Sequence, residues 1–246
     1  MREHLILRLD APLMAFGGIK VDKRGVTSDF PGLSMLSGLL GNALGYDHRD
    51  SHALSAIQGR LRFAVRRDRL GEKLTDYQTV DLAQDHLVDK AWTTRGEAEG
   101  RAGGDAREGT HIRLRDYWAD SVFTLALYLD PAAEEPTLED MERALASPER
   151  PLFLGRKPCL PSAPLLVGRV AADSLVDALR RAPLLAETRR SSGPTMTAWL
   201  PAEEPFDGPS RELQVFDERD WVNQIVAGRR LVKQVALSVR EVGDGR

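Results

Sequence analysis

Apolar and polar positions alternate near the start of the chain. Leu5, Leu7 and Leu9 occupy every second position, and a period of two is typical of a β-strand with one buried face. The outward positions are expected to be His4, Ile6 and Arg8, because successive side chains of a strand point to opposite faces. The pattern predicts a strand over residues 5–9.

Two helices are predicted after a connection rich in glycine and proline at residues 12–32. The first has apolar residues at helical spacing and is expected to end at Gly45, and Ser34 or Ser37 is a candidate N-cap. Its apolar residues are Leu36, Leu39, Leu40 and Leu44. A shorter helix is predicted over residues 53–57.

The next alternating segment combines apolar residues with arginines. Leu61, Phe63 and Val65 would face the core of the protein. Arg60, Arg62 and Arg66 would lie on the other face. Such a row of guanidinium groups could follow a phosphate backbone, and it could equally be a solvated sheet face.

The elements that follow complete a recognisable order. A nearly continuous apolar run at residues 121–129 is typical of a central strand. Thr137 precedes a helix with acidic residues in its first turn, an apolar stripe and a closing Pro148. A last strand is predicted over residues 165–170. The order strand, helix, two strands, helix and strand predicts an α+β fold with a ferredoxin-like (RNA-recognition-like) core.

A long insertion at residues 74–117 separates the second and third predicted strands. Its middle, residues 92–110, is rich in glycine, glutamate and arginine and has no periodicity, which predicts an arm, or thumb, that becomes ordered on binding. We predict a core over residues 1–170 that includes this arm. A C-terminal extension over residues 171–246, with a helix at 173–181 and a strand at 231–239, is expected to pack on the core.

Composition narrows the class of protein. The chain has 246 residues, of which 42% are apolar and 29% charged, with a net charge of −3. It has no apolar run of the roughly 18 residues that a membrane-spanning helix needs. Its one cysteine, Cys159, excludes an internal disulfide and is expected to be buried packing. We therefore expect a cytoplasmic protein without a membrane segment, and an acidic net charge is unusual for a free-standing nucleic-acid binder.

Basic residues gather at a glycine turn in residues 151–165 (PLFLGRKPCLPSAPL). Arg156 and Lys157 follow Gly155 directly. A glycine allows a phosphate to approach the backbone closely, and two cations beside it would attract one. A solvated basic turn is the other interpretation of this segment alone.

Aromatic residues flank the predicted arm at both of its roots. Tyr77 and Thr79 lie at the first root, and Tyr117 and Trp118 lie at the second beside Arg113 and Arg115. Aromatic rings next to arginines can stack on unpaired bases and neutralise phosphates. Packing at strand ends is the alternative explanation for isolated aromatic residues.

Motifs for catalysis or cofactors are lacking. His48 and His52 have helical spacing, but no acidic-histidine signature completes a metal site. No nucleophile elbow, dinucleotide-binding fingerprint or phosphate-binding loop is present. We expect no catalytic residues, no metal and no cofactor.

Several of these segments together resemble the CasD family, the subunit of the type I-E CRISPR surveillance complex (Cascade) that holds the 5′ end of the guide RNA. The strongest are residues 154–165 (LGRKPCLPSAPL) and 117–127 (YWADSVFTLAL). Residues 14–17 (MAFG), 37–45 (SGLLGNALG) and 76–80 (DYQTV) precede them in the expected order.

The resemblance implies a non-catalytic antiviral RNA-binding subunit that caps the 5′ handle of the guide RNA. It also implies contacts with the backbone and large subunits of Cascade, and with target DNA only through the complex. The implied RNA-binding residues are Arg24, Ser37, Tyr77, Thr79, Arg113, Arg115, Arg156 and Lys157. The arm residues Trp92, Arg95 and Arg101 are expected to contact partner subunits. This chain has Phe16 where many relatives have tryptophan, and Leu33 where many have a basic residue.

Two other functions are compatible with the sequence. A sister subfamily from type I-C systems consists of metal-independent endoribonucleases that process CRISPR repeat RNA, and Lys73, His111 and Tyr117 are candidates for such acid–base chemistry. An interaction protein without RNA contact is the third hypothesis.

Overall fold

The central feature of the molecule is a sheet of seven strands in which all neighbouring strands are antiparallel. The computed structural model describes residues 1–18, 23–81, 91–92, 98–99, 110–185 and 195–238. The strands lie in the order β10-β1-β9-β4-β11-β13-β12. Their bounds are β1 Arg2–Asp10, β4 Leu61–Arg69, β9 Val122–Leu129, β10 Leu166–Ala172, β11 Thr195–Pro201, β12 Ser210–Asp220 and β13 Ile225–Ser238.

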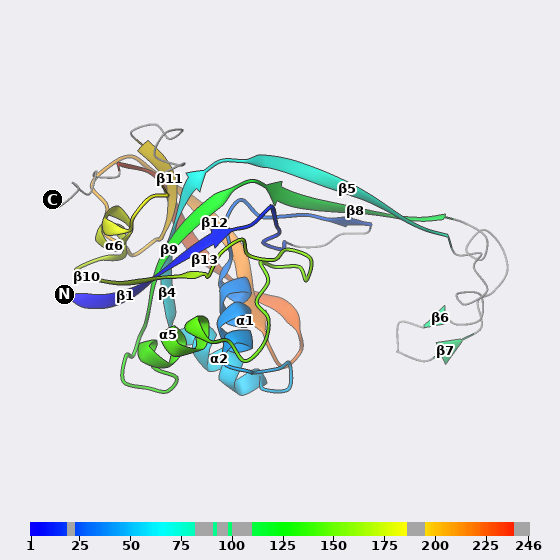
Figure 1. Cartoon of the computed structure of the whole chain (residues 1–246), viewed down its shortest axis with the longest axis horizontal. Helices are drawn as coiled ribbons and strands as arrows, with labels where there is room; N and C mark the ends of the chain where they lie inside the picture. The colour runs from blue at the N-terminus through cyan, green and yellow to red at the C-terminus, as the bar shows by residue number, and fades with distance from the viewer. Residues whose placement is uncertain (19–22, 82–90, 93–97, 100–109, 186–194, 239–246) are drawn as a thin grey trace.

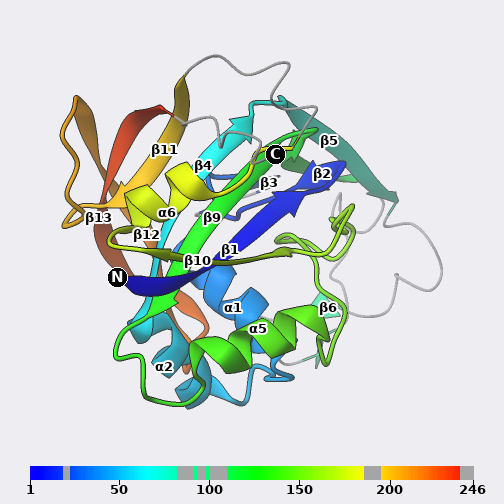
Figure 2. The same cartoon turned by 60° about the vertical axis from the view of Figure 1, so that its left-hand side comes forward.

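Helices cover both faces of this sheet (Figures 1 and 2). Three of the described helices lie on one face, and α6 lies on the other. The three are α1 Leu33–Ala43, α2 Ser51–Arg60 and α5 Leu138–Ala146, and α6 is Leu175–Arg181. The predicted helices and the strands at 5–9, 121–129 and 165–170 are thereby confirmed, with ends shifted by a few residues.

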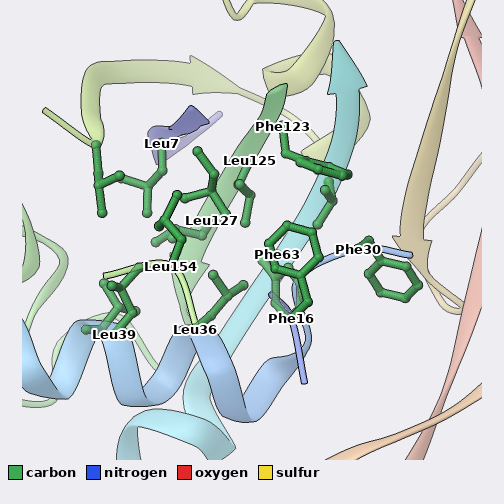
Figure 3. Packing of buried hydrophobic residues seen from close by; sticks show 14 of the residues in the cluster. Leu7, Phe16, Phe30, Leu36, Leu39, Phe63, Phe123, Leu125, Leu127 and Leu154 are labelled. Atoms are coloured by element: carbon green, nitrogen blue, oxygen red, sulfur yellow. The ribbon is translucent and has the colours of Figure 1, made fainter. Parts of the chain in front are cut away.

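The larger core lies between the sheet and the three helices α1, α2 and α5. Leu7 of β1, Leu125 and Leu127 of β9 and Phe63 of β4 meet Leu36 of α1 there (Figure 3). The inward positions predicted from the alternation of Leu5, Leu7 and Leu9 are confirmed, because all three are fully buried.

The opposite face of the sheet is also buried, and the prediction that its residues point outward is wrong. His4 and Ile6 are each 1% exposed, and Arg8 donates a hydrogen bond to the carbonyl of Pro183. Small residues of the sheet, Ala64 and Ala126, allow α6 to pack closely. The sequence pattern of β1 could not reveal this cover, since α6 lies more than 160 residues further along the chain.

Arg66 of β4 is part of that second core, so neither interpretation of the arginine row fits this residue. Arg66 is fully buried, and its Nε lies 2.5 Å from Asp68 Oδ1. It also donates to the carbonyls of Leu179 and Ala182 at the C-terminal end of α6. Arg60 ends α2 and donates to four carbonyls between Pro131 and Pro136. Arg62 donates to the carbonyls of Gly59 and Leu61.

The start of α1 differs from the prediction, because neither Ser34 nor Ser37 is its cap. The N-cap is Gly32, and the free N–H of Leu33 donates to Asp217 Oδ2 of β12 at 2.8 Å. Arg230 of β13 in turn donates to Asp217 at 2.8 Å. Ser37 is fully buried and donates its hydroxyl to the carbonyl of Leu33. By contrast, Thr137 caps α5 in a capping box with Asp140, which confirms the helix start predicted there.

A long two-stranded ribbon leaves the body of the molecule between β4 and β9 (Figure 1). Strands β5 Glu72–Asp81 and β8 Thr110–Ala119 form it, and they extend two residues beyond each end of the insertion predicted at 74–117. Short strands β2 Leu13–Met14 and β3 Arg24–Gly25 pair with β8 near its root. Strands β6 Ala91–Trp92 and β7 Ala98–Glu99 pair with each other. The rest of the predicted arm lies outside the described residues.

Candidate nucleic-acid interface

The register of the ribbon sorts the predicted site residues onto two faces. Asp76 lies opposite Arg115, Gln78 opposite Arg113, and Lys73 opposite Trp118. Directly opposed residues of an antiparallel pair share a face. The arginine face consists of Leu74, Asp76, Gln78, Arg113, Arg115 and Tyr117. The tryptophan face consists of Lys73, Thr75, Tyr77, Thr79, Ile112, Leu114, Asp116 and Trp118.

On the arginine face, two guanidinium groups converge on the backbone of Gly25. A Cβ at this glycine would lie 2.9 Å from Arg115 Nη1 and 3.1 Å from Arg156 Nη2. Among the residues that the structure describes, no ion pair joins Arg113, Arg115, Arg156 or Lys157 to a carboxylate. Asp76 shares this face and lies opposite Arg115, but in the described part of the chain it forms no ion pair with these cations, so they still favour a bound anion.

The turn that carries Arg156 is held by close backbone packing. Gly155 has a φ of +93°, and a Cβ there would lie 1.5 Å from the carbonyl oxygen of Ala15. The N–H of Ala15 donates to the carbonyl of Leu154 at 3.1 Å. The glycine therefore serves the approach of the protein's own backbone, which the sequence motif alone did not distinguish from the approach of a phosphate.

Arg156 connects three parts of the site. Its Nη1 donates to the carbonyl of Asp116 at 3.0 Å, and its Nη2 donates to the carbonyl of Gly25 at 2.9 Å. Its guanidinium also stacks 4.6 Å from the centre of the Tyr117 ring. These contacts fix β3 against β8 and leave Nε and one hydrogen on each terminal nitrogen for a ligand. Lys157, the next residue, is exposed.

On the tryptophan face, Asp116 organises the root of the ribbon. Arg24 Nε donates to its Oδ2 at 3.1 Å, and Thr75 donates to its Oδ1 at 2.8 Å. Burial opposes the charged form of Asp116, but the bonds from Arg24 and Thr75 outweigh it, so the pKa of this carboxyl lies below its ordinary value. The pair holds Arg24 beside β8 with much of its side chain in solvent.

The remaining predicted residues fall into different environments. The side chain of Tyr77 is 60% exposed, and Thr79 is exposed on the same face. Tyr117 and Trp118 are each 5% exposed, so they pack in the core, as the alternative explanation proposed. Ser37 is enclosed in α1. Trp92 belongs to β6, whereas Arg95 and Arg101 lie outside the described residues.

Two residues of this candidate interface were not predicted from the sequence. Asp116 lies between the noted Arg115 and Tyr117, and a carboxylate inside a basic segment was the available signal. Gly25 follows Arg24, and the absence of a side chain there lets Arg115 and Arg156 approach the backbone.

Within the described ranges, no group of three or more histidine, cysteine, aspartate or glutamate side chains is placed to hold a metal ion. In the same part of the chain, no helix has both the length and the apolar character needed to cross a membrane.

Comparison with known proteins gives consistent matches over most of the chain. A family model described as CRISPR-associated protein (Cas_Cas5) matches residues 4–233. The chain is 34% identical over 179 residues to the CRISPR system Cascade subunit CasD of Escherichia coli (strain K12), a match that covers 73% of this chain and 76% of that protein.

Solved structures give a similar result. A chain of a CRISPR RNA-guided surveillance complex aligns with a TM-score of 0.67 and 25% identity, over 99% of this chain and 95% of that chain. A crystal structure of a Cas protein aligns with a TM-score of 0.56 and 27% identity, over 96% of this chain and 95% of that chain. The mixed α/β architecture with a mostly antiparallel sheet is therefore shared with these proteins.

Proposed function

Because the chain belongs to the Cas_Cas5 family of CRISPR-associated proteins, we propose that it is a non-catalytic RNA-binding subunit of a type I-E surveillance complex (Cascade). It caps the 5′ handle of the guide RNA. The observation that carries this proposal is the convergence of Arg115 and Arg156 on Gly25 without a carboxylate partner in the described part of the chain. Similarity to CasD supports the same assignment.

The arginine face supplies the phosphate contacts in this proposal. Arg113, Arg115 and Lys157 offer cations, and Arg156 both contacts phosphate and holds the turn in place. Contacts to phosphate fix the position and direction of a nucleic acid without reading its sequence. On the other face, the exposed ring of Tyr77 provides a surface on which an unpaired base can stack.

We also propose that β10, β1, β9 and β4 with α1 and α5 form a ferredoxin-like core. The support is their order along the chain, two strand–helix–strand units, together with the order of the four strands in the sheet. The division at residue 170 stays a prediction. The chain continues across it within β10, and β11 of the extension pairs with β4.

The arm residues Trp92, Arg95 and Arg101 are proposed to contact the backbone subunit of Cascade. The core is proposed to contact the large subunit and thereby target DNA. Both proposals rest on the family resemblance and on the similarity to a chain of a surveillance complex.

Cleavage of RNA is not favoured by the geometry of the candidate residues. Lys73 lies on the tryptophan face and binds Asp29 at 2.9 Å. Tyr117 lies on the arginine face, in the core. Residues that share one proton-transfer reaction must reach the same atoms, and these two point to opposite sides of the ribbon. Repeat RNA incubated with the purified chain should therefore remain intact, and site-specific cleavage would contradict a non-catalytic role.

The direct test is to purify the tagged protein from cells that express its neighbouring genes and to sequence the 5′ ends of the bound RNA. We expect one shared short 5′ sequence and partner proteins in fixed ratio. Protein that is recovered alone and free of RNA would contradict the proposal.

A variant pair then tests the arginine face. In Arg113→Gln/Arg115→Gln, the slope of log affinity against log salt concentration should decrease by about 0.7 for each lost phosphate contact. The control Arg49→Gln/Arg62→Gln removes the same charge elsewhere. If both variant pairs have equal RNA affinity and equal salt slope, the arginine face is excluded as the RNA-binding surface.

A further inference from the structure

Arg67 of β4 has surroundings unlike those of the other arginines on its strand. Its guanidinium carbon lies 5.9 Å from the centre of the Trp118 ring and 5.4 Å from that of Trp199. Trp118 belongs to the ribbon and Trp199 to β11. Both rings are buried, and the partly buried Arg67 lies between them at the root of the ribbon.

Within the described ranges, no hydrogen bond or ion pair links this guanidinium to a protein acceptor, so its five N–H groups are available. Arg66 and Arg69 beside it donate to Asp68 and Asp120, respectively. Burial lowers the pKa of Arg67, and attraction from Asp29 only partly offsets this effect. Two aromatic rings thus lie beside this cation without accepting hydrogen bonds from its N–H groups.

The charged residues around Arg67 leave a net positive charge beside the Trp118 ring. Lys73 Nζ lies 4.9 Å from the centre of the same Trp118 ring, and it binds Asp29 at 2.9 Å. One carboxylate therefore stands beside two cations. The indole N–H of Trp118 donates to the carbonyl of Ser28 at 2.8 Å, which fixes the ring and leaves Arg67 and Lys73 as the donors open to a ligand.

We propose that Arg67 and Lys73 form a second phosphate-binding position, on the tryptophan face, for single-stranded nucleic acid. Lys73 and Tyr77 lie on the same face of β5, about 13 Å apart at a rise of about 3.3 Å per residue. A strand whose base stacks on Tyr77 can bring a phosphate further along its backbone to Lys73, and Arg67 lies beside the same Trp118 ring as Lys73. The exposed ring on this face favours a nucleic acid over a carboxylate of a protein. This inference rests on the proposed function and extends it to the opposite side of the ribbon.

The test uses indole N–H signals in NMR spectra of the full chain, assigned with Trp→Phe variants. The probe is an oligonucleotide of eight uridines. We expect the signals of Trp118 and Trp199 to shift during the titration, because a phosphate on Arg67 changes the field at both rings. If the probe binds but both signals stay in place, the second position is excluded while the proposed function stands. If the probe does not bind at any concentration, the second phosphate-binding position and the proposed function both fail.

Substitution provides an independent readout. Arg67→Met keeps the aliphatic stem between the rings and removes the charge, and the control Arg62→Met makes the same change on the same strand. We expect the salt slope for the probe to fall by about 0.7 in Arg67→Met and to be unchanged in Arg62→Met. Lys73→Met repeats the test without altering a partly buried arginine. Slopes equal to that of the control in both variants would overturn the proposal.

Discussion

Arg66 of β4 and the arginines of β8 all lie on strands with alternating side chains, yet they have opposite roles. In β4, Arg66 is fully buried, and its donors are used by Asp68 and by the C-terminal carbonyls of α6. In β8, Arg113 and Arg115 lie on a ribbon that leaves the sheet, with no carboxylate partner in the described part of the chain (Figure 1). The acceptors that the fold brings to an arginine, rather than its spacing, decide whether it stabilises the protein or remains free to bind.

The largest effect is expected from removing an arginine whose donors are fully used. Arg66→Leu leaves Asp68 buried without its cation, and we expect the free energy of unfolding to fall by about 3–5 kcal/mol. Urea denaturation measures this change. Arg66→Leu/Asp68→Leu is the matched variant and should recover part of the loss, because no charge is left unpaired. A loss below about 1 kcal/mol in the single variant would contradict the assigned role of this pair.

Arg156 combines the two roles, because two backbone carbonyls hold its guanidinium and its remaining N–H groups can still bind a phosphate. Arg156→Lys keeps the charge but cannot span the carbonyls of Asp116 and Gly25. We expect the free energy of unfolding to fall by about 1–2 kcal/mol. RNA affinity should fall more than in Arg115→Lys, where a point charge can still meet a phosphate. Equal affinities of the two lysine variants would show that the anchoring does not matter for binding.

Asp116→Asn tests the carboxylate that anchors the ribbon root. Because the pKa of Asp116 is lowered in the fold, its charged form stabilises the protein above its ordinary pKa of about 3.9, and this contribution is lost as the pH falls through the lower folded value. At pH 7 we expect the variant to be less stable by about 1 kcal/mol. The difference should disappear on acidification toward pH 2. Urea denaturation across this range measures it, and a constant difference would contradict the assignment.

The smallest effect is expected at Arg62, whose hydrogen bonds in the described part of the chain go to nearby carbonyls at the start of β4. Arg62→Met should change the free energy of unfolding by no more than about 0.5 kcal/mol. Its RNA affinity should match that of the unaltered protein in a filter-binding assay. A marked loss of affinity would mean that Arg62 also contributes to the interface, and the contrast between its face of β4 and the arginine face of the ribbon would fail.

Local patterns were sufficient to predict those parts of the fold that depend on neighbouring residues. The alternation of Leu5, Leu7 and Leu9 located β1, and Thr137 marked the start of α5. Local patterns could not predict contacts between distant segments. Examples are the packing of α6 over His4 and Ile6 and the hydrogen bond of Asp217 at the start of α1. In the site, residue types indicated Arg115 and Arg156. The register of β5 against β8 was needed to separate Tyr77 from the arginines.

The hydrogen bond from Leu33 to Asp217 joins residues 184 positions apart. A ribosome that adds about 5–20 residues per second makes Asp217 roughly 10–40 s after Leu33. During that interval α1 lacks the acceptor that completes its first turn in the folded protein. Nascent chains should therefore keep the start of α1 open to hydrogen exchange until the last strands emerge, which makes the final part of synthesis the step that completes one of the earliest helices.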